Sequence, residues 1–241
     1  MTSVSPHDGA AGSVETLYPF LYPDQAGAAG SLTAVLDSVR ASTVAKTAEI
    51  LQLRQQVLEA AGIALAACAS QMAARFDRGG RLLAFGNGGS ATDAQELATL
   101  FLAPGGTARP LPALSLASDP AVLTALCNDI GVDVVFARQV AAFGTSADIA
   151  VALSTSGNSE NLLRGLAAAR QRGMLAVGIA GYNGGKMAEM DGIDYLFVAP
   201  SASVHRIQEA QTTMYHALWE LCQAALEPAG RRSLDEEPGP P

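Results

Sequence analysis

The chain has 241 residues, of which 49% are hydrophobic and 16% charged, and its formal net charge is −8 at pH 7. This length suffices for one well-buried α/β domain with flanking segments, and the negative charge argues against nucleic-acid binding through Lys and Arg contacts to phosphates. No run approaches the roughly 18 apolar residues of a membrane span, and no signal peptide is evident, so we expect a cytoplasmic protein without a membrane partner.

Residues 1–30 are rich in Gly, Ala, Ser and Pro, a composition typical of a poorly ordered segment. Within it, LYPFLYPD (Leu17 to Asp24) either packs on the core of its own or a neighbouring subunit or docks a partner. From Ser31 to Arg78 apolar residues recur at helical spacing, which predicts two helices or one bent helix. Gly79 and Gly80 are the expected end of this helical region.

Five short apolar runs then alternate with segments of helical periodicity. The runs are 81–86, 111–116, 147–154, 174–181 and 194–200. Such alternation predicts an α/β fold whose parallel sheet is covered by helices on both faces. A last amphipathic helix is expected from about Ser203 to Leu226, followed by a disordered acidic and Pro-rich tail over 227–241.

The loop GNGGS, Gly86 to Ser90, follows the first predicted strand and opens a helix. Glycines there permit tight turns and close backbone approach, while Asn87 and Ser90 supply side-chain donors. Ligands of open parallel sheets bind beyond the carboxyl ends of strands, which favours a phosphate site, although plain turn chemistry also explains the glycines.

A second loop, STSGNS, follows the third predicted strand and precedes another helix. Its four hydroxyls belong to Ser154, Thr155, Ser156 and Ser159, whereas a helix N-cap needs only one. Hydroxyls together with free N–H groups at a helix N-terminus form an uncharged anion site. This loop is therefore predicted to bind phosphate.

Together the two loops resemble the sugar isomerase (SIS) domain family, and more closely its phosphoheptose isomerase branch. The resemblance is ungapped from about Gly80 to Pro110 and continues through CNDIGVDVVFARQV (127–140), ALSTSGNSENLL (152–163), AGYNGGKMA (180–188) and RIQEAQTTMYH (206–216). It implies a flavodoxin-like three-layer SIS fold over residues 31–226, with a five-stranded parallel sheet and an N-terminal helical extension. It also implies a homotetramer with active sites at subunit interfaces.

By this resemblance the ligand is a phosphorylated sugar. The residues expected to bind it are Asn87, Gly88, Ser90, Asp129, Ser154, Thr155, Ser156, Ser159 and Gln208. Asp129 would contact the polar groups of the sugar, or would instead cap a turn between helices.

The branch interconverts aldose and ketose phosphates: a proton leaves the carbon next to the carbonyl, an enediol forms, and a proton returns to the neighbouring carbon. Its members commonly bind zinc through a His and a Glu on the first helix after the GNGGS-type loop, together with a Gln and a His on the last helix. Gln208 and His216 match the last-helix pair, and their spacing lets both face one cleft. A lone His on an apolar helix is more often a core residue than a ligand, but the matching Gln208 favours His216 as a ligand.

The pair on the first helix is altered. Glu96 stands at the family's His position, and Leu100, which can neither ligate a metal nor move a proton, stands at its Glu position. Glu96 could hold Zn²⁺ together with Gln208 and His216, could be the base of a metal-free site, or could be a solvated helix residue. His205 and Pro104 stand where the family often has an Asp and an Arg.

We therefore expect an aldose–ketose isomerase acting on sedoheptulose 7-phosphate or a similar ketose phosphate, with His216 and Glu96 as catalytic groups and no nucleotide cofactor. The alternative is a non-catalytic phosphosugar-binding regulator or assembly factor that has lost its acid–base Glu. Leu100 favours the alternative, whereas retention of Gln208, His216 and the loop hydroxyls favours the enzyme. A dehydrogenase is excluded, because GNGGSA lacks the dinucleotide-binding pattern and its acidic residue after the next strand.

Overall fold

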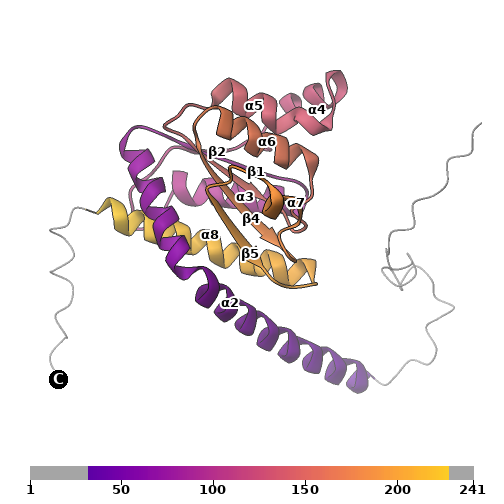
Figure 1. Cartoon of the computed structure of the whole chain (residues 1–241). Helices are drawn as coiled ribbons and strands as arrows, with labels where there is room; N and C mark the ends of the chain where they lie inside the picture. The colour runs from indigo at the N-terminus through magenta and orange to yellow at the C-terminus, as the bar shows by residue number, and fades with distance from the viewer. Residues whose placement is uncertain (1–31, 228–241) are drawn as a thin grey trace, which may run out of the picture. The chain divides into compact units, whose positions relative to one another are not determined.

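The computed structural model describes residues 32–227 (Figure 1). The predicted N-terminal segment 1–30, with its aromatic stretch, and the predicted tail beyond residue 227 lie outside the described residues. The chain divides into two units, residues 1–47 and 48–241, and the boundary falls within the first described helix.

Five parallel strands form one sheet in the order β2-β1-β3-β4-β5. They are β1 (Leu82–Gly86), β2 (Ala113–Ser115), β3 (Ile149–Leu153), β4 (Leu175–Gly181) and β5 (Tyr195–Ala199). Every residue of β1, β3 and β4 is buried, as expected of continuous apolar runs between two helical layers. All five predicted strands are present, shortened by at most two residues at either end, and the predicted parallel sheet is confirmed.

The helices cover both faces of this sheet. They are α2 (Leu32–Asp77), α3 (Gly89–Leu102), α4 (Pro120–Asp129), the short 3-10 helix η3 (Val132–Val134), α5 (Val135–Phe143), α6 (Glu160–Gln171), α7 (Gly185–Glu189) and α8 (Val204–Leu226). The last part of α2 packs with α3 and α8 on one face, whereas α5, α6 and α7 pack on the other (Figure 1). The result is the predicted three-layer arrangement.

Helix α2 is one continuous helix rather than two. It ends as predicted, because Gly79 has a positive φ of 80° and Gly80 N donates to Arg75 O over 3.0 Å. A Cβ on Gly80 would lie 2.0 Å from the Ala147 carbonyl oxygen, so the chain can turn into β1 here only with glycine.

Helix α2 also corrects the expectation about membrane-length apolar segments. Between Ala34 and Asp77 it contains an 18-residue window of mean hydropathy 1.5, so it is long and apolar enough to cross a membrane by length and composition. Only 33% of that window is buried. Alanines raise the mean hydropathy between the larger residues Leu65, Met72 and Phe76, which are buried in the core on the sheet. A single helix of this kind is weak evidence for a membrane span, so composition alone assigns α2 no membrane role.

The sheet order places the two Gly- and Ser-rich loops next to each other. Gly86, the last residue of β1, is in register with Leu153, the last residue of β3. The chain leaves β1 toward β2 on one side and β3 toward β4 on the other, and such a reversal of strand order opens a crevice beyond the strand ends. Both loops start at this crevice.

Candidate functional site

The first loop is shaped by its glycines. Gly88 precedes α3 with a positive φ of 54°, and no side chain caps this helix end. A Cβ on Gly86 would lie 2.3 Å from the Ser90 carbonyl oxygen. A Cβ on Gly89 would lie 2.2 Å from Gln208 Nε2, so this glycine lets α8 approach the start of α3. The loop therefore brings Gln208 to the helix N-terminus, where anions are favoured.

Asn87 links the first loop to the second. Its side-chain amide exchanges two hydrogen bonds with that of Asn161, each 2.9 Å long. Asn161 is buried at the start of α6, directly beyond the second loop. Asn87, predicted to bind substrate, thus also holds the two loops in register. Asn161 was not predicted, although a polar residue on the buried face of α6 was the available signal.

The second loop uses part of its hydroxyls to fold itself. Ser154 Oγ accepts from Gly157 N over 3.0 Å, and Ser156 Oγ accepts from Asn158 N over 3.2 Å. Ser159 is the N-cap residue of α6, yet its side chain makes no capping hydrogen bond. Within residues 32–227, no side-chain hydrogen bond engages the Thr155 hydroxyl. Thr155 and Ser159 therefore carry the hydroxyls that are open to a ligand.

Gly157 and Asn158 hold the second loop against neighbouring segments. Gly157 has a positive φ of 67°, and a Cβ there would lie 1.9 Å from the Gly184 carbonyl oxygen. Asn158 Oδ1 accepts from Lys186 N over 2.9 Å, which ties the loop to the start of α7. The backbone of the loop is thus held by two neighbouring segments.

Glu96 and His216 meet between α3 and α8. Glu96 Oε1 lies 3.3 Å from His216 Nε2, and their side chains are 54% and 40% exposed. Glu96 Oε2 accepts a 2.7 Å hydrogen bond from the hydroxyl of Tyr215. An acid–base pair that is both in contact and accessible can exchange protons with a ligand.

Tyr215 was not predicted as a site residue. Its ring is fully buried, and this burial raises the pKa of its hydroxyl above the ordinary value of 10. The hydrogen bond to Thr212 works in the opposite direction, and the one to Glu96 raises the pKa further. The hydroxyl therefore stays protonated and acts as a donor. Its place on the last predicted amphipathic helix indicates no more than a core residue.

Asp93, one turn before Glu96 on α3, is a second residue that was not predicted. Partial burial raises the pKa of its carboxyl to about 6, the nearby Glu96 raises it as well, and a hydrogen bond with Gln208 lowers it. Its Oδ2 atom is buried without a hydrogen-bond partner. A carboxyl of this kind titrates close to neutral pH beside the candidate proton-transfer pair.

His216 also borders a cavity of about 350 Å³. The cavity is lined by Arg54, Thr212, Thr213, His216, Ala217 and Glu220. Thr212, His216 and Glu220 are spaced four residues apart, so they form one stripe along α8. The imidazole of His216 therefore borders open space on the face of α8 that also carries Thr212 and Glu220.

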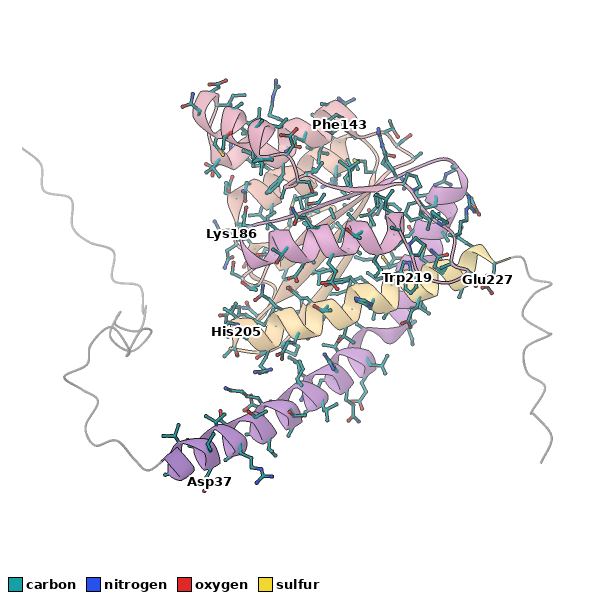
Figure 2. The ribbon with its side chains drawn as sticks, turned by 180° about the vertical axis from the view of Figure 1, so that it is seen from behind. Asp37, Phe143, Lys186, His205, Trp219 and Glu227 are labelled. Carbon is teal, nitrogen blue, oxygen red and sulfur yellow. The ribbon has the colours of Figure 1, made fainter. Side chains whose placement is uncertain are left out.

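Three residues singled out from the sequence lie outside this cluster. Leu100 is half-buried against the core on the sheet, and His205 is exposed at the start of α8 (Figure 2). Asp129 is exposed at the end of α4, where its Oδ1 accepts from Asn128 Nδ2 over 2.9 Å. Within the described part of the chain, no hydrogen bond joins Asp129 to either loop, and its substrate role stays a prediction.

The three predicted zinc ligands already have partners within the protein. Glu96 and His216 are close enough to share an ion, but Gln208 is turned to Asp93 and the backbone of Gly89. Both Glu96 oxygens already face partners, Nε2 of His216 and the hydroxyl of Tyr215. Within residues 32–227, no three His, Cys, Asp or Glu side chains gather in a way that could hold a metal ion. Zinc binding therefore stays a prediction, and no step below passes through it.

Comparison with known proteins identifies the family of this chain. The SIS domain family matches residues 47–181, more than half of the chain. The phosphoheptose isomerase of Aquifex aeolicus is 40% identical over 185 residues, which cover 76% of this chain and 92% of that protein. That of Solidesulfovibrio magneticus is 47% identical over 156 residues, 64% of this chain and 75% of that protein.

Solved structures show the same fold. A phosphoheptose isomerase from Francisella tularensis superposes with a TM-score of 0.72 at 31% identity, covering 79% of this chain and 98% of that one. The phosphoheptose isomerase of Neisseria gonorrhoeae gives a TM-score of 0.69 at 35% identity, covering 77% and 99%. The chain therefore belongs to the SIS domain family and, within it, to the phosphoheptose isomerases.

Proposed function

We propose that this protein is an aldose–ketose isomerase that converts sedoheptulose 7-phosphate into the corresponding aldose phosphate. One observation carries the proposal: the Glu96–His216 pair lies on the two helices whose first turns border the phosphate loops. The relatives described above are named for this activity. It is an intramolecular oxidoreduction, in which the carbonyl moves from one carbon to its neighbour.

The substrate phosphate would bind at the second loop. Thr155 and Ser159 offer hydroxyls, and the N-terminus of α6 offers backbone N–H groups and a favourable dipole. From there the sugar chain would extend along the stripe of Gln208, Thr212 and His216, which spans roughly 12 Å of α8. This path leads the carbonyl end to Glu96.

Proton transfer would be divided between the two side chains. Glu96 takes the proton from C1 of the ketose while His216 gives a proton to the C2 carbonyl oxygen, and the enediol forms. The intermediate collapses when His216 removes the proton from the oxygen on C1 and Glu96 delivers its proton to C2. Every proton taken is returned, so the pair ends in its starting state.

In this proposal Glu96 performs the proton transfer of the family's Glu, whose position is occupied by Leu100 in this chain. Glu96 is 54% exposed and lies 3.3 Å from His216, which supports a base that a substrate can reach. Leu100 belongs to the core edge instead. The protein can therefore be catalytic although Leu100 replaces the carboxylate of the family.

We further propose that the chain assembles with copies of itself, as a tetramer, and works in the cytoplasm. Large apolar side chains are exposed on α2, including Ile63 at 91% and Leu58 at 65%. Cys68, Cys127 and Cys222 are all free thiols, as is usual in a reducing compartment. Light scattering on the purified full chain measures the assembly, and a monomeric mass would contradict it.

The activity is tested with purified protein and sedoheptulose 7-phosphate, followed by separation of ketose and aldose phosphates. We expect aldose phosphate to accumulate to an equilibrium mixture. Glu96→Gln, which keeps the size of the side chain and removes the base, is the matched control. No aldose phosphate from a folded, assembled protein would refute the proposal.

A further inference from the structure

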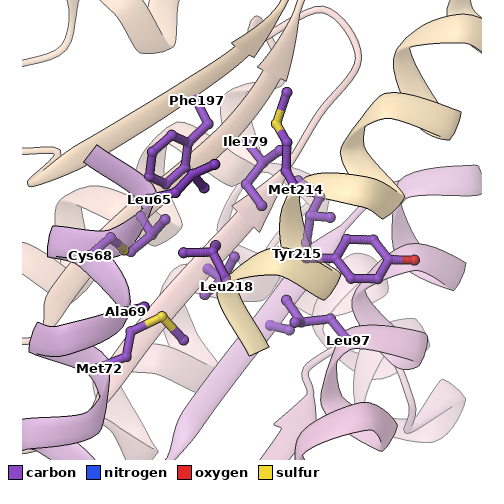
Figure 3. Packing of buried hydrophobic residues seen from close by; sticks show 14 of the residues in the cluster. Leu65, Cys68, Ala69, Met72, Leu97, Ile179, Phe197, Met214, Tyr215 and Leu218 are labelled. Atoms are coloured by element: carbon purple, nitrogen blue, oxygen red, sulfur yellow. The ribbon is translucent and has the colours of Figure 1, made fainter. Parts of the chain in front are cut away.

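The contact between Tyr215 and Glu96 joins a rigid core residue to an exposed one. Tyr215 is 0% exposed, and Figure 3 shows its ring beside Leu97 with the hydroxyl oxygen pointing away from the apolar cluster. That hydroxyl donates to Glu96 Oε2 over 2.7 Å. Because the ring is held by close packing on all sides, its hydroxyl is a donor fixed in space.

This donor decides the orientation of the carboxylate. Glu96 is 54% exposed, so on its own it would populate several rotamers of a long side chain. With Oε2 held by Tyr215, Oε1 of the same carboxylate lies 3.3 Å from Nε2 of His216. A charge-assisted hydrogen bond is strong enough to hold such an arrangement in water.

Tyr215 also contacts the other member of the pair. The Tyr215 and His216 rings have centroids 5.3 Å apart and are inclined by 31°. The Tyr215 hydroxyl lies 3.3 Å from Thr212 Oγ1, and the Thr212 hydroxyl donates to the Gln208 carbonyl oxygen over 3.1 Å. One buried side chain thus contacts both groups that would move protons and is braced by the preceding turn of α8.

We propose that Tyr215 is a positioning residue of the active site: its hydroxyl orients Glu96 so that the second carboxylate oxygen is presented to His216 and the substrate. The inference rests on the proposed function, since it gives Glu96 and His216 the proton transfers. It adds a residue that acts through Glu96 and does not touch the substrate.

The test is Tyr215→Phe, which removes one oxygen and keeps the ring in the core. Tyr195→Phe is the matched control, because the Tyr195 hydroxyl accepts a 2.8 Å hydrogen bond from Gln71 elsewhere in the fold. We expect Tyr215→Phe to lower kcat roughly 10- to 100-fold with KM changed less than about twofold, as for loss of a hydrogen bond to a charged group. The control should keep both constants.

A double-mutant cycle separates positioning from general damage. If Tyr215 acts through Glu96, Tyr215→Phe lowers the residual rate of Glu96→Gln no further. An equal loss in both backgrounds would overturn the inference, as would a kcat for Tyr215→Phe within twofold of the natural protein.

A second measurement needs no turnover. The chain has three histidines, so the imidazole proton NMR signal of His216 can be assigned by its loss in His216→Asn. We expect Tyr215→Phe to move this signal toward its position in Glu96→Gln, while Tyr195→Phe leaves it in place. An unmoved signal in Tyr215→Phe overturns the inference. A moved signal in a protein that isomerises no sugar phosphate would refute the proposed function and leave the positioning role standing.

Discussion

Glu96 and His216 are 120 positions apart in the sequence, and their side chains lie 3.3 Å from each other across the contact of α3 with α8. Helix α3 begins at the first of the two loops predicted to bind phosphate, and Gln208 of α8 reaches the same helix end. The proposed function assigns proton transfer to this pair and phosphate binding to the second loop, so the two roles can be perturbed separately.

Leu100→Glu, which introduces the carboxylate that the family carries at this position, should destabilise the protein without raising its activity. Leu100 packs against the apolar core, so a carboxylate there is poorly hydrated and lowers the free energy of unfolding by about 1–3 kcal/mol. Leu102→Glu is the matched control, because Leu102 is 55% exposed on the same helix, and its effect should stay within about 0.5 kcal/mol. Urea denaturation measures both variants. A Leu100→Glu protein that is as stable as the natural one and turns over faster would show that Glu96 had not replaced the missing group.

Ser159→Ala separates phosphate binding from helix capping. The Ser159 side chain makes no capping hydrogen bond, so its removal should cost less than the ~1 kcal/mol of a working N-cap. If the hydroxyl binds phosphate, KM should rise roughly tenfold with kcat unchanged, because the same contact is present in the ground and transition states. Steady-state kinetics and thermal unfolding of one preparation give both answers. A lowered melting temperature with an unchanged KM would instead assign Ser159 to capping.

Asp93 should make stability fall as pH rises from about 4 to about 6. Burial, with Glu96 nearby, raises its folded pKa from 3.8 to about 6, so in this range the folded state binds more protons than the unfolded state. About one pH unit above the folded pKa the destabilisation is complete and no longer changes with pH. Asp93→Asn removes this destabilisation. The melting temperature of the variant should therefore exceed that of the natural protein by more at pH 7.5 than at pH 4.5.

The exposed carboxylate of Asp191 supplies the control for this measurement through Asp191→Asn. Asp191→Asn also removes one negative charge, but from an exposed position. An advantage of Asp93→Asn that is the same at both pH values would contradict the assignment of the shift to Asp93.

Chelation should leave the isomerase active. Gln208 already contacts Asp93 and the backbone of Gly89, and both Glu96 oxygens face partners, so a zinc ion would have to displace these contacts. We expect activity after EDTA and dialysis to stay within twofold, and added Zn²⁺ to bring no gain. Zinc that restores more than tenfold activity, and binds less tightly to Glu96→Gln by calorimetry, would establish the metal site instead.

The sheet and its loops could be predicted from the sequence because their signals are local. The β1, β3 and β4 segments are continuous apolar runs, and the glycines at Gly79 and Gly88 occupy the left-handed conformations that mark helix boundaries. The sequence did not predict whether α2 is one helix or two, because no residue within its long apolar pattern decides between them.

The contacts within the site could not be predicted in the same way. Periodicity marks Tyr215 as a core position, but whether its hydroxyl reaches Glu96 depends on how α3 and α8 are rotated against each other. The pairing of Asn87 with Asn161 likewise depends on the register of β1 with β3. Asp93 gained its raised pKa from burial between two helices, which the sequence does not encode locally.

The central claim is that Glu96 moves a carbon-bound proton of the sugar phosphate, and NMR of sedoheptulose 7-phosphate in D₂O tests it most directly. We predict loss of the C1 proton signals and growth of aldose-phosphate signals with the natural protein, and a rate lowered at least roughly 100-fold in Glu96→Gln. Broadened ligand signals without exchange, or exchange that persists at the natural rate in Glu96→Gln, would contradict it.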